Sequence, residues 1–558
     1  MGPHLKTATL ICLGAIVGPV ALAAPPAVLT AAVEFPGASA TEVDAQVASP
    51  LAVALSAVEG ARRLEITSVA GRCSAVMRFD ANVEPAAASA SVRDCLNRAM
   101  TTLPAKCPPP LVRRGDPQEL PRLWVSITGE GHGLIQLSEI AQSLSDQLAR
   151  TLGETEVRIF GAAQRTPTLR LDAAKLAACG LTAAEVQRAL ADHPPATAEE
   201  LKNVVIAVRN TIPVRATDVG RVDQEVRGSA FATVDERPAV LVGIATPPAE
   251  ATAAAVQEEL DRLRKILPQG ARVELVADLK RGHFWLLEAT PEPDSSNELA
   301  RRTAGQIMGA LRAAGHANCI GFSSGDAGPF QVFVPAGDQP DGDADLRKRL
   351  AVIPHVTVRV SAAGDHPPFP VRVTLSGPDR NVLHQWAQAV VAGVSAEGTV
   401  LDPDLFPPAD QPRLKFEIDP DAAKRLALSS REIMEAVRLA SGNAAALRLA
   451  GGQAITVRLE APRGPAELLS ALTVRNANGD LVPLGAVANA TAAYEPPALL
   501  RLGTSPAVRL TGAPPAGGTP VAAAATVLRV AAAERETLKL PADYQAADVS
   551  ETADKPSN

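Results

Sequence analysis

The residue pattern that comes nearest to a catalytic site is "GFSSG", residues 321–325, which matches G-x-S-x-G. In hydrolases this pattern places the serine, here Ser323, on a sharp turn between a strand and a helix, where its hydroxyl can attack a carbonyl carbon. The residues that follow, "DAGPFQVFV", instead have the pattern of a strand that begins near Pro329. We therefore interpret the segment as a glycine-rich loop and expect that the protein is not an enzyme.

Two further clusters could hold a metal ion, and both have incomplete spacing. The segment "DGDAD", Asp341 to Asp345, resembles the start of a calcium loop, but the twelfth position is Val352, where such loops have a glutamate. His316 and Cys319 form one H-x-x-C pair without the second pair that a zinc site needs. The sequence also has no G-x-x-x-x-G-K motif for a nucleotide phosphate. We expect no metal and no cofactor.

The composition is that of a folded protein with several compact units. The chain has 558 residues, of which 46% are hydrophobic and 21% are charged, and its formal net charge is -7. This length corresponds to about three to six units of ordinary domain size. No dense run of lysine and arginine is present, so we expect no nucleic-acid partner.

The N-terminus indicates export to the cell envelope. His4 and Lys6 precede the apolar run 7–24, which contains Ala21-Leu22-Ala23, the small-x-small pattern of a signal-peptide cleavage site. The run is also long enough to stay in the inner membrane as a single anchor. Residues 1–24 are therefore either a signal peptide or an N-terminal membrane anchor, and both alternatives predict a periplasmic location for the rest of the chain.

The chain repeats its own pattern. Thr182-x-x-Glu185 and Ser429-x-x-Glu432 both have the form of a helix capping box, in which a hydroxyl and a carboxylate bind the first free amides of a helix. Each follows an alternating strand that ends in an aspartate, and the two are 247 residues apart. A second pair of expected capping boxes begins at Ser39 and Ser295. These pairs indicate a tandem duplication of a unit of about 250 residues.

Within each half the order of expected elements is strand, helix, strand, strand, helix, strand. Residues 62–69 and 74–80, for example, alternate as half-buried strands do. We predict an α+β fold made by tandem duplication of split βαβ, ferredoxin-like subdomains, four in all, with a small insert in each half. The second insert contains "LRLAGG" and "AITVRLE", for which we predict a hairpin.

Several segments resemble the periplasmic region of resistance-nodulation-division (RND) efflux transporters. The segment "APPAVLTAAVEFPGASATEV", residues 24–43, is similar to the A-P-P-A-V strand and aromatic-P-G-A-S turn at the start of that region. The segment "EVRIFGAAQ" resembles the family's L-F-G-x-Q pattern, and "VRNANGDLVPLGAVA" resembles its V-R-x-x-x-G-x-x-V-P-L hairpin. The resemblance extends in order from residue 24 to about residue 548, and it implies the duplication.

The resemblance also implies names and boundaries for the units, which are porter subdomains and docking-like inserts. The first porter subdomain is expected at 25–118, the second at 119–178 and 228–280, the third at 281–368, and the fourth at 369–424 and 495–548. The reduced docking-like insert is expected at 179–227, the second docking-like insert at 425–494, and a polar tail at 549–558. The reduced insert lacks the long hairpin that helps hold trimers of the family together, which weighs against a trimer.

By the resemblance, the chain is expected to be the porter region of an RND efflux transporter without its own proton-translocating membrane domain. RND permeases have twelve membrane helices. Only the first of them has a counterpart here, which is residues 7–24. The implied partners are hydrophobic or amphiphilic small molecules and a periplasmic adaptor or RND partner protein. The alternative is a periplasmic structural or assembly protein that uses porter-like domains to bind another protein.

The resemblance finally implies a solute-binding pocket between two porter subdomains, lined by aromatic side chains and closed by a glycine-rich loop. The matching positions in this sequence are Phe160 in the L-F-G pattern, Ile320 and Phe322 at the start of the glycine-rich loop, and Phe333 on the next strand. Apolar walls of this kind suit a broad class of hydrophobic solutes. The alternative is that these four residues are ordinary core residues.

Overall fold

The computed structural model describes most of the chain from residue 27 to residue 550. The described residues are 27–105, 107–116, 119–152, 156–209, 211–227, 231–245, 250–279, 282–292, 297–323, 329–336, 342–363, 368–440, 445–448, 454–460, 469 and 472–550. The expected signal or anchor segment and most of the glycine-rich loop lie outside them. In these ranges, no helix combines the length and the hydrophobicity needed to cross a membrane.

The first and fourth subdomains share one sheet, although they lie at opposite ends of the sequence. Its described strands run in the order β29-β19-β28-β27-β2-β3-β1-β4, with β20 also paired to β28. They are β1 (Val28–Glu34), β2 (Ala61–Val69), β3 (Arg72–Phe79), β4 (Leu111–Arg114), β19 (Val371–Ser376), β20 (Leu401–Phe406), β27 (Ala498–Leu502), β28 (Ser505–Ala513) and β29 (Gln545–Asp548). The junction is the antiparallel pair β2 and β27, in which Thr67 faces Leu500.

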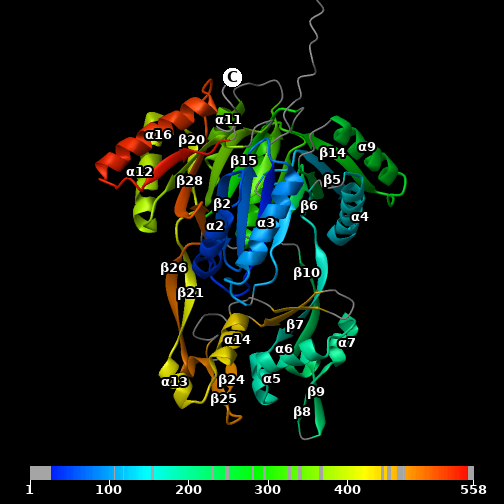
Figure 1. The fold of residues 1–558 in the computed structure, drawn as a ribbon. Helices are drawn as coiled ribbons and strands as arrows, with labels where there is room; N and C mark the ends of the chain where they lie inside the picture. The colour runs from blue at the N-terminus through cyan, green and yellow to red at the C-terminus, as the bar shows by residue number, and fades with distance from the viewer. Residues whose placement is uncertain are drawn as a thin grey trace, which may run out of the picture.

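Helices cover one face of each end of this shared sheet (Figure 1). They are α1 (Ala40–Val43), the π-helix η1 (Asp44–Ala48), α2 (Ser49–Leu55) and α3 (Pro85–Ala99) on the first subdomain, and α12 (Arg380–Glu397) and α16 (Pro520–Thr537) on the fourth. The capping box predicted at Ser39 is present, since Glu42 N donates to the Ser39 hydroxyl and Ser39 N donates to the Glu42 carboxylate. Apolar side chains from both layers form one core in each subdomain.

The second and third subdomains each have a sheet of their own. The second contains β5 (Leu123–Gly129), β6 (Val157–Phe160), β13 (Val240–Ile244) and β14 (Ala271–Asp278), in the order β14-β5-β13-β6, with α4 (Leu134–Leu152) and α9 (Glu250–Arg264) packed on it. The third contains β15 (Phe284–Pro291), β16 (Ile320–Ser323), β17 (Phe330–Pro335) and β18 (Val356–Ala363), with α10 (Asn297–Ala313) and α11 (Gly342–Leu350).

The sheet of the third subdomain also contains two strands from the first half of the chain. β11 (Ala232–Val234) and β12 (Arg237–Pro238) extend it in the order β12-β11-β16-β17-β15-β18. Ala232 faces Phe322 across the β11–β16 pair. The two halves are therefore joined by strand pairing at this sheet as well as at the shared sheet of the first and fourth subdomains.

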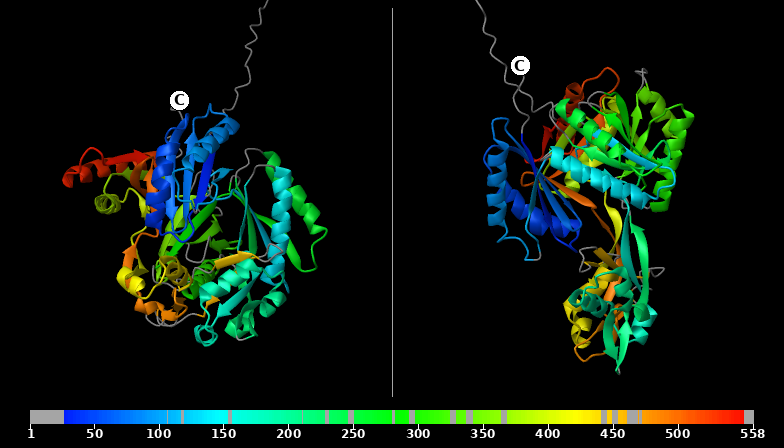
Figure 2. Two further views of the ribbon diagram at one scale, coloured as in Figure 1. Left: turned by 60° about the horizontal axis from the view of Figure 1, so that its bottom comes forward. Right: turned by 90° about the vertical axis from the view of Figure 1, so that its right-hand side faces the viewer.

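The two inserts lie together below the four subdomains, and long antiparallel strand pairs connect them to the main body (Figures 1 and 2). The first insert and its connection contain β7 (Gln164–Leu171), α5 (Ala173–Ala178), α6 (Ala183–Asp192), α7 (Ala198–Asn203), β8 (Val205–Arg209), β9 (Ile212–Arg215), α8 (Ala216–Val219) and β10 (Gly220–Arg227). The second contains β21 (Gln411–Ile418), α13 (Pro420–Arg425), α14 (Ser430–Ala440), β22 (Ala445–Arg448), β23 (Ala454–Leu459), β24 (Thr473–Arg475), β25 (Leu481–Pro483), η2 (Leu484–Ala486) and β26 (Ala488–Glu495).

The hairpin predicted in the second insert is confirmed, because β22 pairs antiparallel with β23. Its location was not predicted: β23 also pairs in parallel with β7 of the first insert, so that the described strands form a sheet in the order β10-β7-β23-β22. Thr182 and Glu185 form the predicted capping box of α6. At the corresponding start of α14, Glu432 N donates to the Ser429 hydroxyl, and this hydroxyl donates to the Glu432 carboxylate.

Candidate functional site

The four residues predicted to line a pocket come together in one aromatic cluster. Phe322 lies 5.1 Å from Phe160 and 5.7 Å from Phe333, measured between ring centroids. Ile320 belongs to the same buried group of residues. Trp124, which the sequence did not single out, lies at the centre of the cluster, 4.5 Å from Phe322, 5.0 Å from Phe160 and 5.3 Å from Phe333.

The cluster is built from two sheets that belong to different halves of the chain. Trp124 and Phe160 lie on β5 and β6 of the second subdomain, whereas Phe322 and Phe333 lie on β16 and β17 of the third. Ile320 and Phe322 are two residues apart on one strand and therefore point to the same face of its sheet. The opposite face of that sheet packs against α10 and α11. The cluster thus fills the interface between the second and third subdomains.

In this structure the cluster is closed. Trp124, Ile320, Phe322 and Phe333 have no solvent-accessible surface, and Phe160 is partly buried. The Trp124 Nε1 donates a hydrogen bond of 2.7 Å to the Pro121 carbonyl, which satisfies its only polar group. The predicted pocket residues therefore pack on one another, and a solute would reach them only after the two subdomains move apart.

An open cavity of about 240 Å³ lies beside the cluster, where all four subdomains meet. Its charged lining consists, among the described residues, of six arginines and five carboxylates. The arginines are Arg63, Arg78, Arg122, Arg359, Arg372 and Arg509, and the carboxylates are Glu65, Asp116, Glu119, Glu288 and Asp404. We call this space the charged cavity.

On the side of the third and fourth subdomains, the charged cavity is lined by Arg359 of β18, which contacts residues of both subdomains. Its Nη1 lies 3.1 Å from Glu288 Oε2 and 3.3 Å from Asp404 Oδ2. Its Nε donates to the Asp402 carbonyl, and its Nη2 donates to the carbonyl and the hydroxyl of Thr511. The side chain is only 8% exposed. Every nitrogen of this guanidinium therefore has an acceptor, as a buried charge requires.

Burial raises the pKa of the Glu288 carboxyl, and the charge of Asp404 adds to this effect. Arg359 acts in the opposite direction and lowers the pKa of Glu288, without cancelling the effect of burial. Removing a carboxylate from water disfavours its charged form, whereas a neighbouring cation favours it. Of the groups around Glu288, Arg359 is the one that most favours its charged form.

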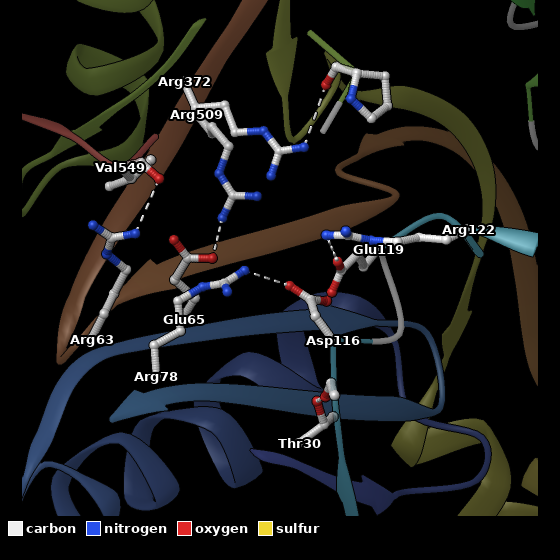
Figure 3. Close-up of polar contacts among 12 residues, drawn as sticks. Thr30, Arg63, Glu65, Arg78, Asp116, Glu119, Arg122, Arg372, Arg509 and Val549 are labelled. Carbon is white, nitrogen blue, oxygen red and sulfur yellow. Dashed lines mark hydrogen bonds and ion pairs between the residues drawn. The ribbon is translucent and has the colours of Figure 1, made fainter. Parts of the chain in front are cut away.

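The other side of the charged cavity is formed by the first and fourth subdomains (Figure 3). Arg78 on β3 binds Asp116 at 3.0 Å, and Arg63 on β2 donates a hydrogen bond of 3.0 Å to the Val549 carbonyl. Arg509 on β28 forms a close ion pair with Glu65 on β2. The contacts of Arg63 and Arg509 connect segments more than 400 residues apart in the sequence.

The charged cavity and the aromatic cluster share a wall. Leu279, Ala363 and Phe369 line the cavity and also belong to the buried group that contains Trp124. Arg359 lies over the Phe369 ring, with its central carbon 3.9 Å from the ring centroid, a cation–π contact. A polar space and an apolar interface are therefore in direct contact at the centre of the molecule.

Sequence patterns contained only weak signals for these additional residues. Arg63 and Glu65 alternate on β2 with buried apolar residues, which reveals one polar face of a strand without showing what it faces. Arg359 is the one charged residue in the strand "VTVRVSAA", and a charged residue on a buried strand needs a partner. No sequence pattern indicated a role for Trp124, apart from the large size of its side chain.

A separate ion pair holds the two inserts together. Arg475 of β24 lies 2.7 Å from Glu185 of α6, across the interface between the inserts. Burial raises the pKa of Glu185, but hydrogen bonds from Arg475 and from the Thr182 backbone outweigh burial, so that the pKa of this carboxyl is lowered. Both side chains are 26% exposed. The pair is therefore partly shielded from water, and we expect it to contribute to the stability of the fold.

Glu185→Gln is expected to lower the free energy of unfolding at pH 7 by about 1–2 kcal/mol, because a hydrogen bond to a charged group is replaced by a neutral one. Glutamine keeps the acceptor of the capping box. Glu432→Gln, at the corresponding position of α14, is the matched control and is expected to change stability by less than about 0.5 kcal/mol. Urea unfolding followed by circular dichroism measures both effects.

The pH dependence provides a second readout of this pair. A carboxyl whose pKa is lowered by folding adds stability above its unfolded pKa, and this stability is lost as the pH falls through the folded pKa. The difference between the wild type and Glu185→Gln is therefore expected to shrink as the pH is lowered below about 4. A difference that stays constant down to pH 3 would show that the charge of Glu185 is not the cause.

The comparison with known protein families supports the resemblance found in the sequence. The chain matches the model of the AcrB/AcrD/AcrF family over residues 17–194 and 346–555, which is more than half of its length. Phe160 lies within the first matched segment, whereas Ile320, Phe322 and Phe333 lie between the two. The fold has the mixed α+β subdomains expected for this family. The chain therefore belongs to the AcrB/AcrD/AcrF family and is related in function to RND-type transporters.

Proposed function

We propose that this chain is the periplasmic porter region of an RND-type transporter and that it binds hydrophobic or amphiphilic solutes at the aromatic cluster. The observation that supports this proposal most strongly is the meeting of Phe160, Phe322 and Phe333 around Trp124 between two subdomains. Aromatic and aliphatic walls at an interface between subdomains are typical of sites that accept small apolar molecules.

Binding at this site requires the second and third subdomains to separate. The aromatic rings that now contact one another would then contact the solute, so the apolar area exposed by opening is covered again. Strand β11, which comes from the first half and pairs with β16, acts as the connection that keeps the two subdomains together during this movement. The free energy of opening reduces the apparent affinity for solutes.

The test is equilibrium binding of a fluorescent hydrophobic dye to the purified protein, with two variants on one strand. Phe333→Ala removes a ring from the aromatic cluster, whereas Phe330→Ala removes a similarly buried ring from the other face of β17, where it packs in the core of the third subdomain. We expect saturable binding in the micromolar range, about −8 kcal/mol, by the wild type and by Phe330→Ala. Phe333→Ala is expected to bind at least about tenfold more weakly.

The two variants lose similar packing, so their thermal midpoints and circular dichroism spectra check that both remain folded. Absence of saturation in the wild type, or equal affinities of the two variants, would show that the cluster is not the binding site.

The closed state of the cluster favours a second candidate, in which the porter-like domains serve as a scaffold for a periplasmic adaptor or another RND protein. Trp124 fills the centre of the interface completely, as a structural core residue does. Crosslinking in cells separates the two candidates. One dominant protein partner without measurable dye binding would support the scaffold, and dye binding that depends on Phe333 would support the solute site.

A further inference from the structure

Strand β20 of the fourth subdomain has an irregularity at Asp402. Leu401 faces Ala513 on β28. The next paired residue, Asp404, faces Thr511, so β20 has one residue more than β28 over this interval. A bulge of this kind turns a side chain away from the ladder of its own sheet. Asp402 also has a left-handed backbone with a φ of 50°, which is uncommon outside glycine, and such a conformation persists only when other contacts stabilise it.

The Asp402 side chain binds the outer edge of the third subdomain. Strand β18 is at the end of its sheet among the described strands, and the polar backbone groups of such a strand need partners outside the sheet. Val360 N donates a hydrogen bond of 3.0 Å to Asp402 Oδ2, and Val360 O accepts one of 2.7 Å from Arg347 Nη2. Arg347 Nε in turn donates to Asp402 Oδ2 at 2.9 Å. The Arg347–Asp402 ion pair thus occupies the place of a further strand at Val360.

Arg359, the residue before Val360, binds the backbone of the same bulge. Its Nε donates to the Asp402 carbonyl at 3.0 Å, and its Nη2 donates to the Thr511 hydroxyl of β28 at 2.9 Å. Two arginines of the third subdomain therefore hold Asp402, one through its carboxylate and the other through its carbonyl. We call Asp402, Arg347, Arg359 and the backbone of Val360 the Asp402 clamp.

The charges of the Asp402 clamp are largely removed from water. The side chains of Arg347 and Asp402 are 22% and 21% exposed, and that of Arg359 is 8% exposed. Burial lowers the pKa of the Arg347 guanidinium, but hydrogen bonds to Asp402 and Asp343 outweigh burial, so that this pKa is raised. Hydrogen bonds of charged groups are among the stronger ones in proteins, and separating the third and fourth subdomains would break several of them at once.

The interface between the second and third subdomains has a different chemical character. At its centre the rings of the aromatic cluster contact one another, and they belong to Trp124, Phe160, Phe322 and Phe333. Apolar contacts have no required direction, and the apolar part of a solute can replace them. The hydrogen bonds of the Asp402 clamp need fixed donors and acceptors, which such a solute does not provide. A hydrophobic solute therefore separates the second and third subdomains more easily than the third and fourth.

We propose that the Asp402 clamp holds the third and fourth subdomains together as one body, and that the solute site opens by movement of the second subdomain against this body. The first subdomain belongs to the same body, because β2 and β27 continue one sheet from the first subdomain into the fourth. The movement of the second subdomain rests on the proposed function, whereas the clamp is tested in the absence of a solute.

The experiment measures distances between pairs of nitroxide labels on the full chain by pulsed electron paramagnetic resonance. Ile266, Val352 and Val521 are exposed residues of the second, third and fourth subdomains, and they are replaced by cysteine in pairs. Native Cys12 and Cys179 are first replaced by serine, and the four other cysteines are buried. Saturation with the fluorescent hydrophobic dye is expected to shift the distance between labels at 266 and 352 by more than about 2 Å. The distance between labels at 352 and 521 is expected to change by less than about 1 Å.

Two matched variants test the clamp without dye. Asp402→Asn and Asp343→Asn each remove one carboxylate from Arg347, and the two carboxylates are equally exposed, but only Asp402 lies across the subdomain interface. A third variant, Asp402→Gly, removes the acceptor entirely and suits the left-handed backbone. We expect the distribution of distances between labels at 352 and 521 to broaden in Asp402→Gly and to broaden less in Asp402→Asn. In Asp343→Asn it is expected to stay as in the wild type.

Hydrogen exchange of the Val360 amide gives a second readout of the clamp. This N–H donates to Asp402, so Asp402→Gly is expected to raise its exchange rate at least about tenfold. The exchange rate in Asp343→Asn is expected to stay as in the wild type. Amides that pair β15 with β18 are expected to remain protected in all variants, which checks that the third subdomain is still folded.

The outcomes separate the clamp from the proposed function. Unchanged distance distributions and unchanged exchange of Val360 in Asp402→Gly would overturn the clamp, and so would equal broadening in Asp343→Asn. A dye-induced shift between labels at 352 and 521 that is as large as the shift between labels at 266 and 352 would overturn the movement of the second subdomain against a single body. Absence of dye binding would overturn the proposed function and this movement with it, while broadening in Asp402→Gly would still support the clamp.

Discussion

Trp124→Ala is expected to lower the free energy of unfolding by about 3–5 kcal/mol, the usual range when a large aromatic side chain is removed from a packed core. The ring has no accessible surface, and it contacts Phe160 on β6 of the same sheet and Phe322 and Phe333 of the facing sheet. Its removal leaves a cavity at the interface between the second and third subdomains. We therefore expect the variant to loosen this interface as well as to destabilise the fold.

Trp124→Phe separates ring packing from the polar contact. Phenylalanine keeps most of the apolar contacts but cannot donate to the Pro121 carbonyl, so a loss of about 1–2 kcal/mol is expected. Calorimetry gives the stabilities, and hydrogen exchange of β5 and β16 reports on the interface. A loss below about 1 kcal/mol for Trp124→Ala, with unchanged exchange on both strands, would contradict the description of the cluster as the core of this interface.

Arg359→Met is expected to cost about 3–5 kcal/mol at pH 7, because it leaves Glu288 in a buried position without its cation. Methionine has a similar volume and fills the space left by the apolar part of the arginine side chain. Adding Glu288→Gln to this variant removes the isolated charge, and we expect the double variant to recover a large part of the loss. Thermal and urea unfolding of the two variants and the wild type measure the difference.

The sign of the pH dependence follows from the raised pKa of Glu288. A carboxyl whose pKa is raised by folding favours the folded state most below its unfolded pKa, and this contribution is lost as the pH rises through the folded pKa. Without Arg359 the pKa of Glu288 rises further, so Arg359→Met should be more destabilising at pH 8 than at pH 5. The opposite trend would show that Glu288 does not carry the effect.

Much of the secondary structure could be predicted because its determinants are local. The hydroxyl and carboxylate of the capping boxes at Ser39 and Thr182 lie within one helical turn of the amides that they bind, so three residues of spacing are enough to identify them. Strands β2 and β3 alternate in a way that the sequence shows directly. The hairpin of β22 and β23 was predicted for the same reason.

The candidate site could be predicted only in part. The resemblance to the family identified Phe160, Ile320, Phe322 and Phe333, and these residues do lie together in the structure. It did not reveal Trp124 between them, nor that the rings close on one another. Whether a phenylalanine on a strand lines a pocket or fills a core depends on the facing sheet, which one strand's sequence does not describe.

The amino-acid sequence was thus sufficient for the caps of individual helices and for the elements of the α+β subdomains, since each depends on residues a few positions apart. It was also sufficient for the duplication, because a repeat is found by comparing the chain with itself. The folded chain was needed to show that β2 pairs with β27, that β23 pairs with β7, and that arginines from all four subdomains surround one cavity. Those contacts join residues hundreds of positions apart. They arise because apolar faces of separate subdomains must cover one another, and the buried charges at their junction then require partners from whichever strand lies opposite.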